Sequence, residues 1–276
     1  MKRKGEQATL YMQGTHVYVE RWFHTAKKCR GTLLFIHGFL SSSFSFRQLL
    51  PSMPNDYDLL CFDLPGFGKS GKDKTFCYEF KNYAALLTEI MELYELNHVT
   101  LIGHSMGGQV ALYTAKQTPE RIDSLILLSA SAYFHRVKKV VVCSSYIPFF
   151  SSLLYSLGKN RDCKPFIGQL MFKKNAVTSE MVKEYGRPLK DRGFYHSITC
   201  LMRQREGDMS STDLQSIKQR CLIIWGESDP LIPLSVGKKL SHDLHDAKLM
   251  VLPETGHLVP EEQPKKTAQL IKHFLT

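Results

Sequence analysis

Short apolar runs alternate with amphipathic stretches along most of the chain. Continuous apolar runs occur at residues 32–36, 57–62, 99–102, 124–128, 221–225 and 248–252. Such runs are typical of strands that are buried on both faces of a sheet. Stretches with helical periodicity lie between them, at residues 83–96, 105–117, 234–244 and 261–274. The alternation predicts an α/β fold in which helices flank both faces of a mostly parallel sheet of about eight strands.

The N-terminal segment, residues 9–22, has a different pattern. It alternates around Gly14-Thr15, with Val17 and Val19 on one side and Tyr18 and Glu20 on the other. Strict alternation around a glycine-containing turn is typical of two paired strands. We therefore expect an N-terminal antiparallel hairpin.

Residues 131–213 break the alternation of strands and helices. They contain no strand-like repeat, only basic, aromatic-rich and helix-like segments. We expect a helical cap, or lid, inserted over the carboxyl edge of the sheet, between core segments 1–130 and 214–276. The first cap section, residues 140–157, has the apolarity of a membrane span, but Pro148 and five serines interrupt it. We interpret it as a lid wall that faces an apolar pocket. Weak, reversible membrane contact through the cap and a true membrane span are the alternatives.

The positive charge is concentrated in this cap. The chain has a formal net charge of +10, and residues 131–213 contain fourteen Lys or Arg against seven Asp or Glu. Nucleic-acid binding would require that charge to be interleaved with stacking aromatics or placed on a known module, and neither is present. We interpret the charge as a solvated face, with attraction for anionic substrates or anionic lipid surfaces as alternatives.

The cysteines and the N-terminus indicate the compartment. The seven cysteines are an odd, scattered set without a C-x-x-C pair, and the basic start is followed by no apolar stretch of signal-peptide length. These features predict reduced thiols in a cytoplasmic protein. The oligomeric state stays open.

The segment Gly103-His104-Ser105-Met106-Gly107-Gly108 lies between a predicted strand and a predicted helix. The small neighbours allow a sharp turn that places Ser105 in sterically poor backbone space and exposes its hydroxyl beyond the sheet edge. The helix that follows directs free N–H groups and its positive dipole end toward any oxyanion formed there. The segment predicts a nucleophilic serine.

A serine nucleophile needs a base, and the base needs a carboxylate. Asp229 follows the predicted strand 221–225 and His257 follows the strand 248–252. The chain order Ser, Asp, His is the one expected for this type of sheet. Glu227 is the competing carboxylate, whereas the loop after the strand 124–128 offers no acid.

No zinc pattern such as H-E-x-x-H is present, and His242 and His245 on a predicted surface helix are interpreted as solvated. We expect no metal and no cofactor.

Four motifs spread over nearly the whole chain carry a resemblance to a known family. They are His37-Gly38-Phe39, the segment 63–70 (Asp-Leu-Pro-Gly-Phe-Gly-Lys-Ser), the segment 103–108, and the loops that contain Asp229 and His257. As a set they resemble the α/β-hydrolase superfamily, in its capped single-domain branch of esterase-like and C–C bond hydrolase-like serine hydrolases.

This resemblance implies roles for individual residues. Ser105 would be the nucleophile, His257 the general base and then acid, and Asp229 the carboxylate that orients it. The backbone N–H groups of Phe39 and Met106 would form the oxyanion hole.

At matching positions Asp63 and His104 are usually structural, bracing loops under the site. Relatives that cleave epoxides or carbon–halogen bonds carry Asp at the position of Ser105, which argues against those activities.

The expected function is that of a serine hydrolase, a carboxylesterase that acts through an acyl-enzyme on carboxylic esters of small to medium apolar acyl groups. Its partner would be a small-molecule ester. Two alternatives remain: a C–C bond hydrolase of a vinylogous diketone, and a ligand-sensing, hydrolase-like signalling protein. The physiological substrate is not readable from residue types, because the cap sets specificity in this superfamily.

Overall fold

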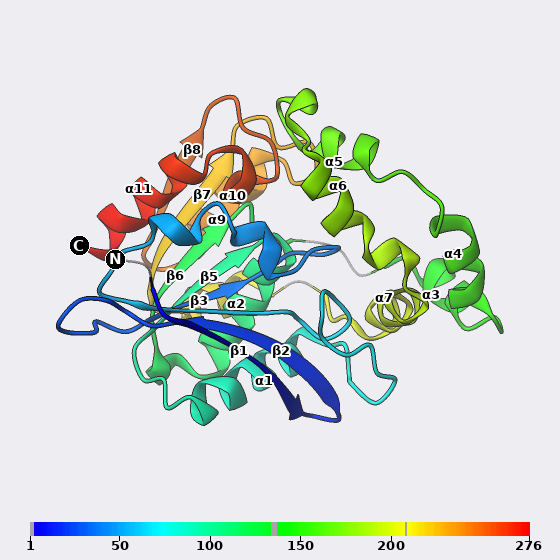
Figure 1. Ribbon diagram of the computed structural model, residues 1–276, viewed down its shortest axis with the longest axis horizontal. Coiled ribbons are helices and arrows are strands. Elements are labelled where there is room, and N and C mark those ends of the chain that lie inside the picture. Colours follow the sequence, from blue (N-terminus) through cyan, green and yellow to red (C-terminus); the bar gives the residue numbers. More distant parts are fainter. Residues whose placement is uncertain (1–2, 134–136, 208) are drawn as a thin grey trace.

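The fold is built on one eight-stranded sheet with the strand order β1-β2-β4-β3-β5-β6-β7-β8 (Figure 1). The computed structural model describes residues 3–133, 137–207 and 209–276, so Arg136 and Asp208, two of the charges counted in the cap, lie outside it. The strands are β1 (Gly5–Met12), β2 (Thr15–Trp22), β3 (Thr32–Ile36), β4 (Asp58–Phe62), β5 (Val99–His104), β6 (Ile122–Leu128), β7 (Arg220–Gly226) and β8 (Ala247–Leu252). β1 and β2 form an antiparallel hairpin that pairs antiparallel with β4, and the other pairs are parallel. The α/β fold and the hairpin predicted from the sequence are confirmed.

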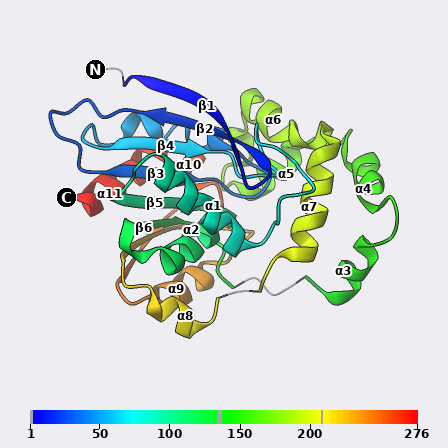
Figure 2. The ribbon, with the colours of Figure 1, turned by 90° about the horizontal axis from the view of Figure 1, so that it is seen from below.

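Helices cover both faces of the sheet (Figures 1 and 2). The core helices are α1 (Phe80–Leu93), α2 (Met106–Gln117), α9 (Leu234–Asp243), α10 (Val259–Glu262) and α11 (Pro264–Leu275), and the short 3-10 turns are η1 (Ser43–Phe46), η2 (Leu50–Ser52), η3 (Pro119–Arg121), η4 (Lys174–Ala176) and η5 (Pro188–Lys190). The predicted helix 261–274 is therefore divided, with Pro264 beginning α11.

Each buried strand supplies two cores, which explains the continuous apolar runs. In β3, Leu34 and Ile36 belong to the cluster that packs against α1 and α2, whereas Leu33 and Phe35 belong to the cluster that packs against α11 and η1. Successive side chains of a strand point to opposite faces, so both sets of positions must be apolar.

The part of the chain between β6 and β7 forms no strand in its described residues. It contains α3 (Lys139–Ser145), α4 (Phe150–Gly158), α5 (Lys164–Leu170), α6 (Ser179–Gly186), α7 (Arg192–Gln204) and α8 (Ser211–Ser216). We call α3–α7 the helical insertion, and Figure 1 shows it grouped beside one end of the sheet. α8 spans the boundary predicted at residue 213 and is bound to the core, where the Ser211 hydroxyl donates a hydrogen bond of 2.9 Å to Asp243 of α9.

The start of α2 packs directly against the backbone of β3. A Cβ atom on Gly107 would lie 2.1 Å from the carbonyl oxygen of Ile36 and 2.6 Å from that of His37. Real Cβ atoms do not approach backbone this closely, so only glycine allows the observed distance between α2 and the strand.

We predict that Gly107→Ala lowers the free energy of unfolding by about 3 kcal/mol, the upper end of the usual cost of overpacking, because backbone rather than a flexible side chain must move. Gly168→Ala in α5 is the matched control, since its Cβ would meet nothing closer than 3.4 Å. Urea unfolding monitored by circular dichroism measures both variants. Equal stabilities for the two variants would contradict the packing argument.

Candidate active site

Ser105 lies in a strained turn between β5 and α2. Its backbone has φ 52° and ψ −120°, a region that non-glycine residues rarely adopt. Neighbouring segments hold it there: the Ser105 N–H donates to the carbonyl of Leu128 at 3.0 Å, and the Ser105 carbonyl accepts from the N–H of Ser131 at 2.9 Å. The turn is thus fixed by the end of β6 and the residues that follow it.

The structure brings Ser105, His257 and Asp229 together, although they follow three different strands. His257 Nε2 lies 3.0 Å from the Ser105 hydroxyl, and His257 Nδ1 lies 2.8 Å from an oxygen of Asp229. The second Asp229 oxygen accepts hydrogen bonds of 2.9 Å from the backbone N–H groups of Leu231 and Ile232. The carboxylate therefore fixes the imidazole with Nε2 toward the serine. The competing Glu227 is exposed to solvent.

Phe39, in the loop after β3, and Met106 of α2 border Ser105. The loop that follows β3 lies against the serine, because a Cβ on Gly38 would be 3.0 Å from the Cβ of Ser105. Met106 is the first residue of α2, where backbone N–H groups have no partner within the helix. In the described part of the chain neither the Phe39 nor the Met106 N–H donates to another protein group. Both residues line a cavity that includes Ser105.

Asp63 and His37 brace the loops beside the site. The Asp63 carboxylate accepts hydrogen bonds from the backbone N–H groups of Ser43 and Lys69, at 2.7 and 2.8 Å. His37 is fully buried, and its Nε2 accepts a hydrogen bond of 2.9 Å from the Leu64 N–H. Burial lowers the pKa of His37. These contacts agree with the structural role that the resemblance implies for Asp63.

His104 lies beneath the candidate base. Its Nε2 donates to the carbonyl oxygen of His257 at 3.0 Å, and its buried Nδ1 has no partner among the described residues. Burial, with the nearby His257 as the next cause, lowers the pKa of His104 to about 3. His104 is therefore a neutral imidazole that holds the backbone of the His257 loop.

The helical insertion also holds this loop. The His257 N–H donates to the carbonyl of Leu170 in α5 at 2.7 Å. The Glu262 carboxylate accepts from the N–H groups of Gly256 at 3.0 Å and Phe172 at 2.7 Å. Sequence reasoning missed both residues. Proximity to the histidine loop was the available signal for Glu262, and none existed for Leu170, which contributes a backbone oxygen.

Three hollows meet near Phe39. The inner cavity, of about 60 Å³, is lined by mostly apolar side chains and is bordered by Ser105, His257 and Tyr185. The side cavity, of about 310 Å³, borders Ser105 and Met106. The outer groove, of about 610 Å³, runs between α4, α5 and α7. Phe39 borders all three, so they converge beside the serine.

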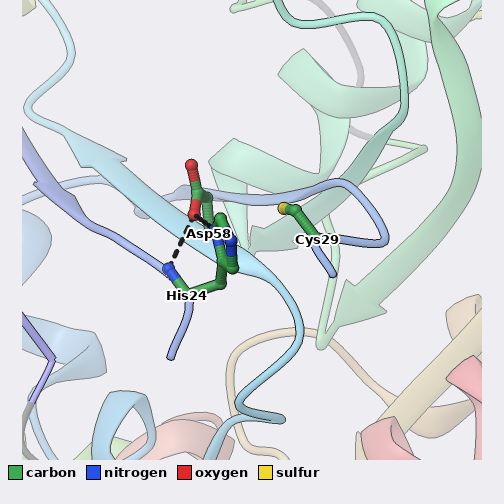
Figure 3. Close-up of side chains that lie close together, drawn as sticks. All are labelled: His24, Cys29 and Asp58. Atoms are coloured by element: carbon green, nitrogen blue, oxygen red, sulfur yellow. Dashed lines mark hydrogen bonds and ion pairs between the residues drawn. The ribbon is translucent and has the colours of Figure 1, made fainter. Parts of the chain in front are cut away.

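One group of side chains far from Ser105 has atoms that could ligate a metal: His24, Cys29 and Asp58 (Figure 3). Asp58 is already bound, because one oxygen accepts from the Arg21 guanidinium at 2.9 Å and the other from His24 Nδ1 at 2.8 Å. Burial alone would raise the pKa of Asp58, but these hydrogen bonds hold it below its usual value. The cationic Arg21 beside the carboxylate disfavours a metal, and we interpret the group as a brace between β2 and β4.

The sheet topology and the serine turn at the end of β5 define an α/β hydrolase. The family model for the alpha/beta hydrolase fold matches residues 31–264, and the chain belongs to this family.

Among its relatives is an uncharacterized hydrolase of Bacillus subtilis, YugF, which is 37% identical over 96% of both chains. The monoacylglycerol lipase abhd6-B of Xenopus laevis is 25% identical over 89% of this chain and 75% of its own length. A solved meta-cleavage product hydrolase from Pseudomonas fluorescens has a similar fold, with a TM-score of 0.77, 21% identity and coverage of 97% of both chains.

The neutral state of His104 predicts a pH dependence of stability. The pKa of His104 is about 3 in the folded chain, against 6.5 for an ordinary histidine. Between these values the unfolded chain binds the proton and the folded chain does not, so the free energy of unfolding falls as pH falls from about 6.5 toward 3. The limiting slope for one group is about 1.4 kcal/mol per pH unit.

We expect urea unfolding to show a smaller slope over this range in His104→Gln than in the wild type. His37 contributes in the same direction in both proteins and therefore cancels in the difference. A stability difference between the two proteins that stays constant with pH would contradict the assignment.

Proposed function

We propose that this hydrolase is a serine carboxylesterase that cleaves esters of small to medium apolar acyl groups through an acyl-enzyme. The observation that carries the proposal is the continuous chain of hydrogen bonds from Ser105 through His257 to Asp229. A serine hydroxyl is a weak nucleophile, and an oriented imidazole at 3.0 Å is the arrangement that activates it.

In the first half-reaction the Ser105 oxygen attacks the ester carbonyl carbon while His257 Nε2 takes the hydroxyl proton. The negative charge that forms on the carbonyl oxygen is stabilised by the backbone N–H groups of Phe39 and Met106. The intermediate collapses when the bond to the alcohol oxygen breaks and His257 returns the proton to that oxygen. Asp229 stabilises the transient imidazolium and stays ionised.

In the second half-reaction a water molecule attacks the acyl-enzyme. His257 takes a proton from the water, the same amides hold the oxyanion, and the proton passes to the Ser105 oxygen as the acid leaves. Each proton accepted by the imidazole is given back within one half-reaction, so the catalyst is regenerated.

The hollows support a division of the substrate between two sides of Ser105. The inner cavity is narrow and apolar, which suits a small acyl group. The side cavity is larger and includes the polar groups of Gln109 and Arg205, which suits the alcohol portion. We further propose that the helical insertion acts as a cap, because Phe166 and Tyr185 from it complete the wall of the inner cavity.

We expect Ser105→Ala to lower kcat for p-nitrophenyl esters at least about 10⁴-fold and to abolish labelling by a fluorophosphonate probe.

Asp229→Asn should lower kcat by about 10⁴-fold, because an amide no longer favours the imidazole tautomer that accepts the serine proton. The control is Ser129→Ala, a buried serine at the end of the neighbouring strand β6, which should retain activity.

Full ester turnover in Ser105→Ala would refute the proposal. A labelled wild type that turns over no ester would also refute the esterase assignment and would favour C–C bond hydrolysis or ligand sensing. Disappearance of a coloured dienolate would identify the former. A single slow turnover with a change in the conformation of the insertion would identify the latter.

A further inference from the structure

The helices α3 and α4 and the turn between them expose several large apolar side chains to solvent. The exposed fractions are 71% at Val140 of α3, 61% at Ile147 and 83% at Phe149 in the turn, and 57% at Leu153 of α4. Isolated exposed apolar residues are common, but a contiguous group on one structural unit marks an interaction site. We call these four residues the apolar tip.

The backbone holds the apolar tip in place. Phe149 has φ 62°, a left-handed conformation that is rare for a bulky residue, and it begins the turn into α4. Arg203 of α7 anchors the preceding turn, because its guanidinium donates to the Ser145 hydroxyl at 2.9 Å and to the Ser145 carbonyl. The same guanidinium lies 4.3 Å from the centre of the Tyr146 ring. The exposure of Phe149 is therefore built into the fold.

The charges around the apolar tip have one sign. Residues 137–161 contain Lys138, Lys139, Lys159 and Arg161 and no Asp or Glu. All four cations are exposed: Lys138 and Lys139 lie at the start of α3, and Lys159 and Arg161 follow α4. An apolar surface flanked by cations complements an anionic bilayer, whose acyl chains take the apolar side chains and whose phosphates attract the cations. Against a second copy of the same face, the cations would repel one another.

The length and bend of the two helices fit a shallow contact. Within the described residues no single helix is long and apolar enough to cross a membrane. α3 and α4 reach that length and apolarity only together, and they are bent by 97° at the break between them. Residues 146–149 form the break between the two helices, and Tyr146, Ile147 and Phe149 within it are exposed.

The helix α4, which carries Leu153 of the apolar tip, also borders the outer groove. Leu154 and Leu157 of α4 line this groove together with Phe39, which borders Ser105 in the two cavities. We propose that the α3–α4 face docks on the surface of an anionic lipid bilayer, and that the outer groove leads an apolar ester from the bilayer to Ser105. The second part rests on the proposed function, whereas the docking does not.

The test is co-sedimentation with vesicles of phosphatidylcholine that contain about one third phosphatidylglycerol. We expect the wild-type chain to bind these vesicles, to bind pure phosphatidylcholine vesicles at least about tenfold more weakly, and to be released as salt is raised. Phe149→Ser combined with Leu153→Ser should lower binding more than tenfold. Lys138→Gln combined with Lys139→Gln should lower it by roughly thirtyfold.

The matched control is Leu93→Ser, which removes an equally exposed leucine from α1 and should bind as the wild type does. Turnover of a soluble short-chain p-nitrophenyl ester is measured in parallel, and we expect no change in any of these variants because none of the substituted residues borders Ser105. If neither the wild type nor any of these variants hydrolyses the soluble ester, the proposed function is refuted, whereas the docking proposal is unaffected.

Wild-type binding that is absent, insensitive to phosphatidylglycerol, or unchanged in Phe149→Ser with Leu153→Ser would overturn the docking proposal. Sedimentation equilibrium adds a further decisive outcome. A wild-type dimer that the same double variant converts to a monomer would assign the face to a second copy of the chain and would also overturn the proposal.

Discussion

The structure depends on the close approach of three backbone segments around Ser105. α2 can begin directly beneath β3 because Gly107 has no side chain, since a Cβ there would lie 2.1 Å from the Ile36 carbonyl. A Cβ on Gly103 would likewise lie 2.5 Å from the Gly107 carbonyl. This packing forces the Ser105 backbone to φ 52°, and the hydrogen bonds that Ser105 donates to the Leu128 carbonyl and accepts from the Ser131 N–H stabilise the strained turn. The strain places the hydroxyl beyond the sheet edge, where residues from other strand ends can reach it.

The helical insertion is physically coupled to this arrangement. It binds the His257 loop through Leu170, and a second link joins Tyr185 of α6 to Glu261 of α10, with a hydrogen bond of 3.0 Å. Glu261 also accepts from the Arg47 guanidinium at 2.6 Å, and burial raises the pKa of Glu261 despite this cation. Because Tyr185 borders the inner cavity, a displacement of α6 would change the cavity and the histidine loop together. The same insertion exposes the apolar tip on its far side.

Much of the fold could be predicted from the sequence because the signals are local. The run 32–36 coincides with β3, and the alternation before Trp22 coincides with β2. The carboxyl ends of parallel strands meet at one edge, so the positions of Ser105, Asp229 and His257 after three such strands were enough to predict that they converge. Tertiary contacts were not predictable in this way. The hydrogen bond from His257 to Leu170 joins backbone groups. Almost every residue type has these groups, so the identity of the residues does not predict the bond.

The sequence by itself determined the α/β fold, the strained serine turn and the proximity of the three candidate catalytic residues, because apolar periodicity and glycine placement act over a few residues. Only the tertiary structure decided that Asp229 rather than Glu227 contacts His257, and that Glu262 and the helical insertion hold the histidine loop. It also decided that Phe149 points to solvent while Leu154 lines a groove. Such outcomes depend on how distant segments pack in space, and a short sequence pattern does not determine that packing.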